Sequence, residues 1–470
     1  MEFRDDIKDV YDISLVASNP EDPKITALKS IGNSFYNNIV VLLYKLIMTT
    51  NLIIIGHVVY ENINHYELAM TYQIGVLVLE ILGKFFIIGL VKYIFEEKED
   101  SDEVYNTFIR LKTSLIFIIP IITIPVSLLS KLIIKLLTKN MIITNEIVDE
   151  VYFKYLLFTP AIYLFEILFF LNIQYMQNQK KTNAVFSYIS FFLICHISTC
   201  WILLYMFEIG IIGLTISYGV NSFLFYLFTN KYIQNIREFE LQGYFFLIPE
   251  SQNFNMEVLN ELKRESSLSF INLGEIFIIH FLFVSSLFTD KNQLIVNIIY
   301  LNVYELIFAV NRGFYYTLKK YISTNVESAE KRQQYVANFS LYFMILGMSF
   351  FIILLVFDNI LLDCFLFDGG NQLLKNIAKN LKIMFSLCIL LNVIRMLLNG
   401  TIRGMNVPFP VIKKIFYCTI CIVLCLVLGF VYEKGVYGLW ISKFILNLLF
   451  VFDNAHKAII YLPQFFHNYI

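Results

Sequence analysis

Charged residues are scarce in this chain: Asp, Glu, Lys and Arg make up only 16% of its 470 residues, against 58% hydrophobic residues. A soluble domain of ordinary composition is about one quarter charged, so this much apolar surface excludes a water-soluble fold. An excess of one sign is missing too, because the formal net charge is -1. Nucleic-acid binding needs concentrated positive charge. We therefore expect a lipid bilayer as the environment and no nucleic-acid partner.

Clusters of residues that hold metals or perform chemistry are also missing. The seven cysteines lie mostly inside apolar runs, as small core residues do, and this includes the Cys418-x-x-Cys421 spacing. The six histidines are scattered without a His-x-x-x-His pair, and no Gly-rich phosphate loop ending in Lys-Ser/Thr occurs. These absences predict neither an enzyme nor an ATP-driven pump, and no bound cofactor.

Long apolar runs are what the chain has in abundance. A hydrocarbon core of about 30 Å is crossed by about 20 apolar residues in a helix, and continuous runs favour helices over a barrel. We predict twelve transmembrane helices, six in each half, at residues 35–56, 67–95, 109–137, 151–175, 183–206, 211–232, 266–288, 294–318, 335–357, 376–399, 410–432 and 436–460.

The predicted helices fall into two groups separated by a polar stretch. An N-terminal segment at 1–34 precedes an N-lobe at 35–233, and a linker at 234–265 leads to a C-lobe at 266–462 and a tail at 463–470. Lys and Arg gather in the even-numbered connections, which predicts cytoplasmic termini and a cytoplasmic linker. The expected fold class is an all-α polytopic membrane protein, in the plasma membrane or an internal one.

One phrase occurs in both halves. Residues Phe207–Ser217 read FEIGIIGLTIS and residues Tyr432–Ser442 read YEKGVYGLWIS, so Glu, both glycines, Leu, Ile and Ser coincide. Each copy ends one apolar run and begins the next. Self-similarity at half the chain length predicts two pseudo-symmetric six-helix bundles, and transporters built from repeats hold their substrate between them.

Several short phrases resemble the multidrug and toxic compound extrusion (MATE) family, above all its eukaryotic branch. Gly56-His57, followed by Glu67-Leu68-Ala69, is similar to the family's Gly-His and Glu-Leu-Ala pair. Residues 175–179 (YMQNQ), 399–404 (NGTIRG) and 435–440 (GVYGLW) are similar to the family's phrases after helix four and around helix eleven, whereas residues 91–95 and 318–323 depart from its loop pattern. The resemblance implies a monomeric antiporter that exports small organic, cationic solutes, coupled to protons or alternatively to sodium.

Two residues in the seventh predicted helix are candidates for coupling and substrate binding. Charged groups inside a bilayer cost several kcal/mol, so they usually face a cavity or a partner. Residues 273–280 (LGEIFIIH) are similar to the family's Glu-x-x-x-x-Glu stretch, which implies that Glu275 is a proton- and substrate-responsive acid. His280 replaces the second glutamate and titrates near neutrality. The alternative is that both residues form hydrogen bonds for helix packing.

Two further acidic positions of the family pattern fall on Asn302 and Asn392, which are neutral. Glu305 and Arg395 lie about one helical turn from these asparagines. They replace the lost polarity or pair with each other.

In the first half, Glu80 and Lys84 stand four residues apart on one helix face, a spacing that allows an ion pair. Such a pair either stays intact and holds the helices together, or is broken by substrate or protons during transport. Lys45, Glu166 and His196 are also polar residues within apolar helices, where snorkelling or local hydrogen bonding explains them as well as cavity lining does.

Other functions remain open at this point. The neutral residues at acidic family positions favour a flippase for a lipid-linked or amphiphilic molecule, which basic residues lining the cavity would indicate, or a MATE-like protein that does not transport. A membrane-embedded enzyme lacks a residue cluster to support it. Aromatic residues reach 17%, enough to line a cavity for organic cations, although such residues also serve packing.

Overall fold

Helices make up the regular structure of the described residues. The computed structural model describes residues 39–57, 65–79, 101–138, 143–179, 181–236, 274–323, 329–356, 358–366, 372–405 and 411–467, with Ala27, Lys29 and Val407. The first half contains α2 Ile39–His57, α3 His65–Leu79, α5 Ser101–Leu137, α6 Asn145–Val151, the π-helix η3 Tyr152–Leu156, α7 Thr159–Asn178, α8 Thr182–Trp201, the π-helix η4 Ile202–Met206 and α9 Ile211–Ile236. The second half contains α11 Gly274–Ser286, α12 Lys291–Ser323, α13 Ala329–Val356, α14 Asp358–Phe365, α15 Gln372–Gly404, α16 Val411–Leu426, the π-helix η7 Val427–Val431 and α17 Gly435–His467.

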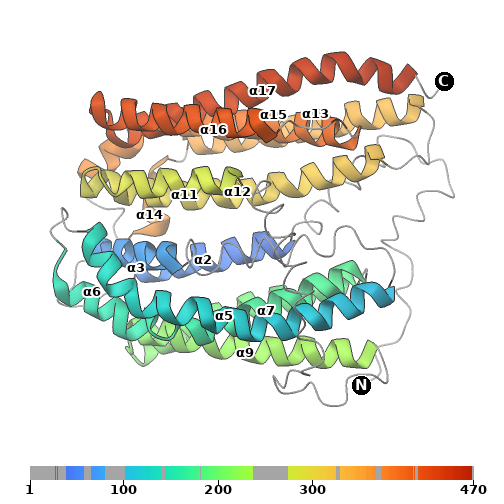
Figure 1. Ribbon diagram of the computed structural model, residues 1–470. Coiled ribbons are helices and arrows are strands. Elements are labelled where there is room, and N and C mark those ends of the chain that lie inside the picture. Colours follow the sequence, from blue (N-terminus) through green and yellow to red (C-terminus); the bar gives the residue numbers. More distant parts are fainter. Residues whose placement is uncertain are drawn as a thin grey trace.

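A helix lies in each of the twelve predicted ranges, and these helices form two bundles with roughly parallel axes (Figure 1). Residues 80–95 and 266–273 of two predicted helices, and nearly all of the predicted linker at 234–265, lie outside the described residues. Helices α2 to α9 form the N-lobe, where α7 packs on α5 and α9. Helices α11 to α17 form the C-lobe, where α15 packs on α12, α13 and α17. Several helices extend beyond the predicted ends. The sequence analysis missed α14, a short helix between α13 and α15.

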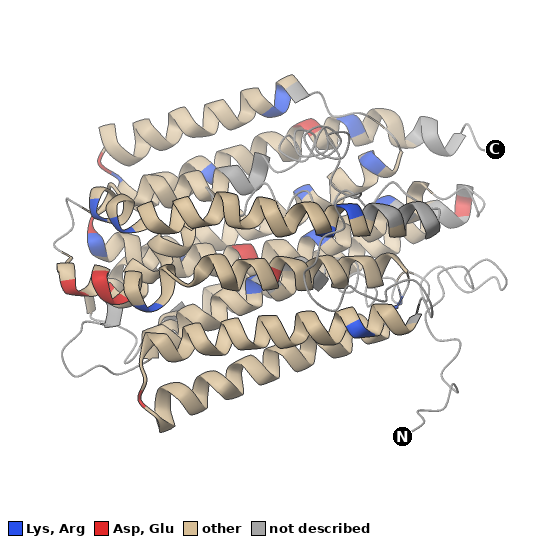
Figure 2. Ribbon diagram, turned by 60° about the horizontal axis from the view of Figure 1, so that its bottom comes forward, with Lys and Arg blue, Asp and Glu red and all other residues tan. Residues whose placement is uncertain are grey.

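The composition of the helices fits a bilayer. Within the described ranges, nine helical spans are long and apolar enough to cross a membrane, and most of the ribbon carries no charged residue (Figure 2). Large apolar side chains point outward, among them Ile121 at 70% and Ile412 at 81% exposure. A surface of this kind is stable against lipid tails rather than water. The protein is an integral multi-pass membrane protein.

The repeated phrase adopts the same backbone in both lobes. The π-helices η4 and η7 precede the two copies, and Glu208 and Glu433 have φ angles of 52° and 53°. The next shared residues, Gly210 and Gly435, have φ angles of 71° and 52°, a region that glycine enters without strain. Each copy therefore makes the same turn between two antiparallel helices, which confirms the structural equivalence of the lobes at this point.

The second glycine of each copy permits close packing across that turn. A Cβ atom on Gly213 would lie 3.1 Å from Leu203 Cβ, and one on Gly438 would lie 2.6 Å from the Leu428 backbone. Leu203 and Leu428 occupy matching positions in η4 and η7. A side chain at either position would therefore crowd the helix that precedes the turn, most severely at Gly438.

The fourth transmembrane segment is interrupted near its N-terminal end. The π-helix η3 separates α6 from α7, and Pro160 lies in the first turn of α7. There the missing N–H of proline costs no helical hydrogen bond. Pi-helical turns are rare and often occur at functional sites. This interruption places Tyr155 beside the interior of the N-lobe.

Candidate functional site

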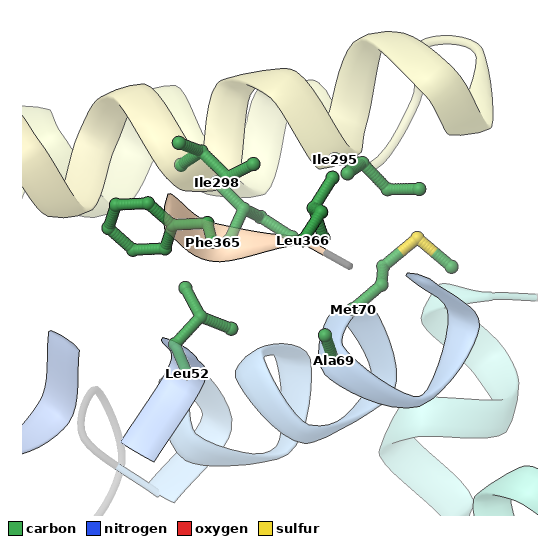
Figure 3. A pocket seen from close by; sticks show the side chains of 8 residues that line it. Leu52, Ala69, Met70, Ile295, Ile298, Phe365 and Leu366 are labelled. Atoms are coloured by element: carbon green, nitrogen blue, oxygen red, sulfur yellow. The ribbon is translucent and has the colours of Figure 1, made fainter. Parts of the chain in front are cut away.

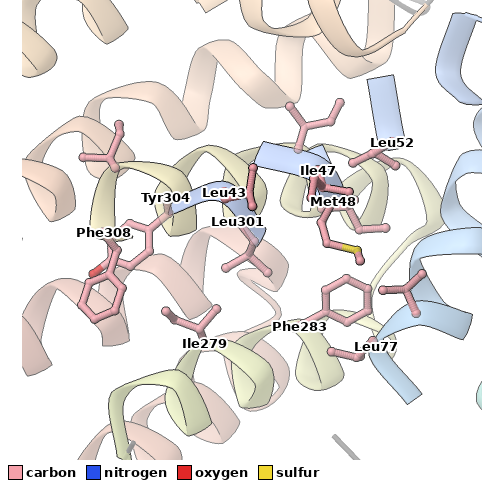
Figure 4. Packing of buried hydrophobic residues seen from close by; sticks show 14 of the residues in the cluster. Leu43, Ile47, Met48, Leu52, Leu77, Ile279, Phe283, Leu301, Tyr304 and Phe308 are labelled. Atoms are coloured by element: carbon pink, nitrogen blue, oxygen red, sulfur yellow. The ribbon is translucent and has the colours of Figure 1, made fainter. Parts of the chain in front are cut away.

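The two lobes meet along one interface, which we call the lobe interface, formed by α2 and α3 of the N-lobe with α12 and α14 of the C-lobe. Its middle is apolar. Leu43 and Ile47 of α2 lie near Leu301 and Tyr304 of α12, and Phe283 of α11 packs beside them (Figure 4). Apolar contacts of this kind involve no directional bonds.

A small apolar pocket opens at the α14 end of the lobe interface (Figure 3). Leu52 and Met70 line it from the N-lobe, and Ile298 and Phe365 line it from the C-lobe. No polar side chain contributes to this lining. The pocket therefore marks imperfect packing between the lobes rather than a site for a polar ligand.

A close contact between the two backbones occurs at the same end. A Cβ atom on Gly56 of α2 would lie 1.9 Å from the Phe365 backbone oxygen of α14, so glycine is required for this contact. The neighbouring His57 contributes a hydrogen bond, with Nε2 3.0 Å from the Cys364 carbonyl oxygen. The carbonyl can only accept, so His57 donates. The Gly-His pair noted in the sequence thus closes the α14 end of the lobe interface.

Two ion pairs also join the lobes. Lys45 Nζ of α2 lies 2.5 Å from Glu305 Oε2 of α12, and both side chains are largely shielded, at 16% and 17% exposure. Glu67 of α3 forms a second ion pair with Lys291, the first residue of α12. Sequence analysis could not find these partners because each pair joins residues more than 200 positions apart.

The N-lobe encloses an acid that sequence analysis gave no specific role. Glu166 of α7 is only 1% exposed. The fully buried side chains of Tyr155, Tyr163 and Tyr218, from η3, α7 and α9, lie near it. Tyr72 of α3 packs on Tyr155 with ring centroids 4.8 Å apart. The Glu166 carboxyl group therefore lies among buried tyrosine side chains.

Hydrogen bonds satisfy His196 in the core of the N-lobe. His196 Nε2 lies 2.7 Å from Asn51 Oδ1, and Nδ1 lies 3.0 Å from Ser217 Oγ. Because Asn51 Oδ1 only accepts, the proton of the neutral imidazole is on Nε2. The His196 ring thus connects α8 by hydrogen bonds to Asn51 of α2 and to Ser217 of α9. This geometry favours local hydrogen bonding over cavity lining as the reason for a histidine here.

A buried lysine lies in the cytoplasm-proximal part of the same lobe by the predicted topology. Lys112 of α5 donates to Asn230 Oδ1 at 2.5 Å. Its ammonium group also lies 5.2 Å from the centroid of the Tyr226 ring. Both partners stabilise a charge that would be costly alone in this environment.

Three basic side chains are buried in the described part of the C-lobe. Arg312, Arg395 and Lys443 are all buried, and Lys443 is fully so. Lys443 directly follows the second copy of the repeated phrase, whereas Tyr218 follows the first. At matching positions, the C-lobe therefore has the cation Lys443 and the N-lobe has Tyr218, which lies near the acid Glu166. The Lys443 ammonium lies 5.3 Å from the centroid of the Tyr304 ring, at the edge of the lobe interface.

The predicted coupling residues lie in different settings. Glu275 is in the first turn of α11, and its side chain is outside the described part. His280 is buried on the same helix. Glu80 and Lys84 are outside the described residues, so their ion pair stays a prediction.

The remaining predicted residues are all described. Asn302 donates to the Ile298 carbonyl of its own helix at 2.9 Å. Asn392 accepts from Arg395 at 2.8 Å, and the Arg395 guanidinium lies 5.5 Å from the Phe450 ring centroid. Glu305 pairs with Lys45. Glu305 and Arg395 therefore do not pair with each other: Glu305 contacts Lys45, and Arg395 contacts Asn392.

Comparison with known proteins rests on structure alone. No family model and no curated protein sequence matches the chain. A crystal structure of the eukaryotic MATE transporter AtDTX14 is similar at a TM-score of 0.67 and 14% identity, covering 93% of this chain and 96% of that one. The chain has the MATE fold.

Both conformations of MATE transporters match over nearly the full length. An inward-facing conformation of a multidrug resistance MATE transporter of the MOP superfamily is similar at a TM-score of 0.65 and 12% identity, covering 94% of this chain and 98% of that one. An outward-facing conformation gives 0.61 at 12% identity, covering 97% and 99%. The MATE fold therefore extends over nearly the whole chain, at a sequence identity of only 12% to both of these structures.

Proposed function

We propose that the protein is a secondary active transporter that exports small organic solutes carrying a cationic group, in exchange for protons, by alternating access of its two lobes. The observation that supports this best is the lobe interface. Two six-helix bundles meet there through apolar side chains in the middle of the interface. Two ion pairs among the described residues, Lys45–Glu305 and Glu67–Lys291, also connect one lobe to the other. Such an interface can open at one end while it closes at the other.

The proposal includes an orientation. With cytoplasmic termini, as the distribution of Lys and Arg predicts, the α14 end of the lobe interface faces the opposite side of the membrane. Gly56, His57 and the Glu67–Lys291 pair then close the outer side. The higher TM-score with the inward-facing conformation supports this assignment. Export would require these contacts to break.

Glu275 is the proposed coupling acid, with His280 as a partner in proton transfer. A carboxyl group held in a cavity of low dielectric changes charge when it exchanges a proton, and this alters which state is favoured. The test is transport of tetraethylammonium into liposomes containing the purified protein, under an imposed pH gradient. We expect uptake to follow the gradient, and Glu275→Gln to abolish this dependence while solute exchange without a gradient persists.

The competing coupling ion is sodium. Replacing sodium by potassium at constant pH separates the two, since proton-coupled uptake is unaffected by this change. If uptake in the wild type ignores the pH gradient, proton coupling is wrong. If no solute moves under either gradient, the protein is a MATE-like scaffold without transport activity.

A flippase for an amphiphilic or lipid-linked molecule is the second candidate function. The buried cations Arg312, Arg395 and Lys443 of the C-lobe favour it, because a phosphate-bearing headgroup would neutralise them. The assay is movement of a fluorescent anionic lipid between leaflets of the same liposomes. Lipid movement with no uptake of tetraethylammonium would favour this function over solute export.

A further inference from the structure

The Lys45–Glu305 pair places one charge on each wall of the space between the lobes. Lys45 belongs to α2 of the N-lobe and Glu305 to α12 of the C-lobe, and their charged atoms are 2.5 Å apart. Leu43 and Ile47 flank Lys45, and Leu301 and Tyr304 lie just before Glu305, all buried at the lobe interface. The pair is thus embedded in the apolar middle, unlike Glu67–Lys291 at the end of α12.

Alternating access must disturb this pair. When the lobes separate at this level, the ammonium group moves away with the N-lobe and the carboxylate with the C-lobe. Each charge then faces an apolar cavity, where a charge that has lost its partner is strongly unfavourable. Within the described ranges, Glu305 makes its one ion pair with Lys45. A ligand that provides new charged partners for Lys45 and Glu305 therefore favours the open state.

We propose that Lys45 and Glu305 form a ligand site divided between the lobes, which selects zwitterionic solutes or headgroups. The ammonium group of the ligand takes the place of Lys45 at Glu305, and its carboxylate or phosphate takes the place of Glu305 at Lys45. This inference rests on the proposed transport function and refines the expected cationic solute by adding an anionic group to it.

Charge complementarity explains why both groups are needed. A ligand with only a cation satisfies Glu305 but is repelled by Lys45, and a ligand with only an anion has the opposite defect. A zwitterion leaves no net charge in the cavity and restores two close charge contacts.

The test uses three related probes that carry different charged groups. Carnitine is zwitterionic, choline lacks its carboxylate, and 3-hydroxybutyrate lacks its ammonium group. In liposomes containing the wild-type protein, we expect carnitine uptake to exceed that of both others by about tenfold or more. If choline moves as well as carnitine does, the divided site is refuted while solute export stands. If none of the three and no tetraethylammonium moves, both proposals fail.

Two variants with nearly unchanged shape distinguish a ligand site from a structural lock. Glu305→Gln should lower carnitine uptake and shift the preference towards 3-hydroxybutyrate, and Lys45→Gln should shift it towards choline. The exchange Lys45→Glu with Glu305→Lys retains the pair and should retain the preference for carnitine even if the single variants fold poorly. Equal loss for all three probes in both single variants, or loss of selectivity in the exchanged protein, would overturn the proposal.

The Glu67–Lys291 pair supplies the matched control. It joins the same two lobes but lies at the helix ends, so Glu67→Gln should change uptake of all three probes by one common factor. A further arm follows a fluorescent phosphatidylcholine in the same liposomes. Its movement without carnitine uptake would identify the zwitterion as a lipid headgroup, and carnitine uptake would identify it as a soluble solute.

Discussion

Gly56 offers the most direct test of how the α14 end of the lobe interface works. In Gly56→Ala, the new methyl group would lie 1.9 Å from the Phe365 backbone oxygen. No pair of such atoms tolerates this distance, and the obstacle is backbone, which cannot move aside by rotating a side chain. The substitution should therefore push α2 and α14 apart and destabilise the state in which this end is closed.

The expected size follows from overpacking at other buried sites. An inserted methylene group typically costs about 1–3 kcal/mol. If this end opens by separating α2 from α14, the cost falls on the closed state alone, so the ratio of open to closed protein rises by about 5- to 150-fold. The effect on overall folding should be smaller, because the strain is released on opening.

The change in the ratio of open to closed protein can be measured by labelling a cysteine introduced at a buried position. Met70 is 1% exposed and lines the pocket between the lobes, so Met70→Cys reacts with a small maleimide only when this end opens. In a Cys364→Ser background, which removes the one exposed cysteine of the described residues, Gly56→Ala should raise the labelling rate by the factor given above.

Gly404→Ala is the matched control. Its Cβ would lie 2.6 Å from Ile322 Cβ, a similar overlap but between two helices of the C-lobe. It should lower the unfolding midpoint and leave the labelling rate at Met70→Cys unchanged. An unchanged or slower labelling rate in Gly56→Ala would contradict the idea that this contact holds the lobes together.

Three further predictions use single substitutions. An impermeant maleimide added to intact cells should label Cys364 if the α14 end faces outward, and Cys364→Ser should abolish the signal; labelling only after permeabilisation would reverse the orientation. Asn230→Leu removes the hydrogen-bond acceptor of the buried Lys112 ammonium group and should destabilise the protein by about 3–5 kcal/mol. Lys112→Met removes the charge itself and should change stability little. Thermal unfolding of the purified variants compares the two. Gly438→Ala should lower the unfolding midpoint more than Gly213→Ala does, since its Cβ would lie closer to backbone, at 2.6 Å from Leu428 rather than 3.1 Å from a Leu203 side chain; the reverse order would contradict the packing argument.

The repeated phrase shows how far sequence reasoning reached. Its two glycines and its glutamate predicted equivalent turns, and the matching φ angles of Glu208 and Glu433 confirm them. This worked because positive φ and close helix contact restrict the residue type locally, so the constraint is visible in a short stretch of sequence. The short helix α14 was missed because eight residues, Asp358–Phe365, are too few to produce a membrane-length apolar run.

Pairing between distant residues was not predictable in the same way. Lys45 and Glu166 were recognised only as polar residues in apolar helices, with no reason to prefer one partner over another. The structure assigns Glu305 to Lys45 and surrounds Glu166 with tyrosines. Many acids and bases satisfy the rule that charges in a membrane need partners, so the rule alone cannot select among them.

The sequence by itself determined the bilayer environment, the twelve helices, the two related halves and the resemblance to MATE transporters, because each depends on local composition or on short spacings. The tertiary structure decided where the halves meet, which charges pair across that contact, and which charged side chains of the described residues are buried within each lobe. These features depend on the relative positions of helices that are hundreds of residues apart. Packing of apolar surfaces sets those positions, and the few buried charges then interact with whichever groups the packing brings near.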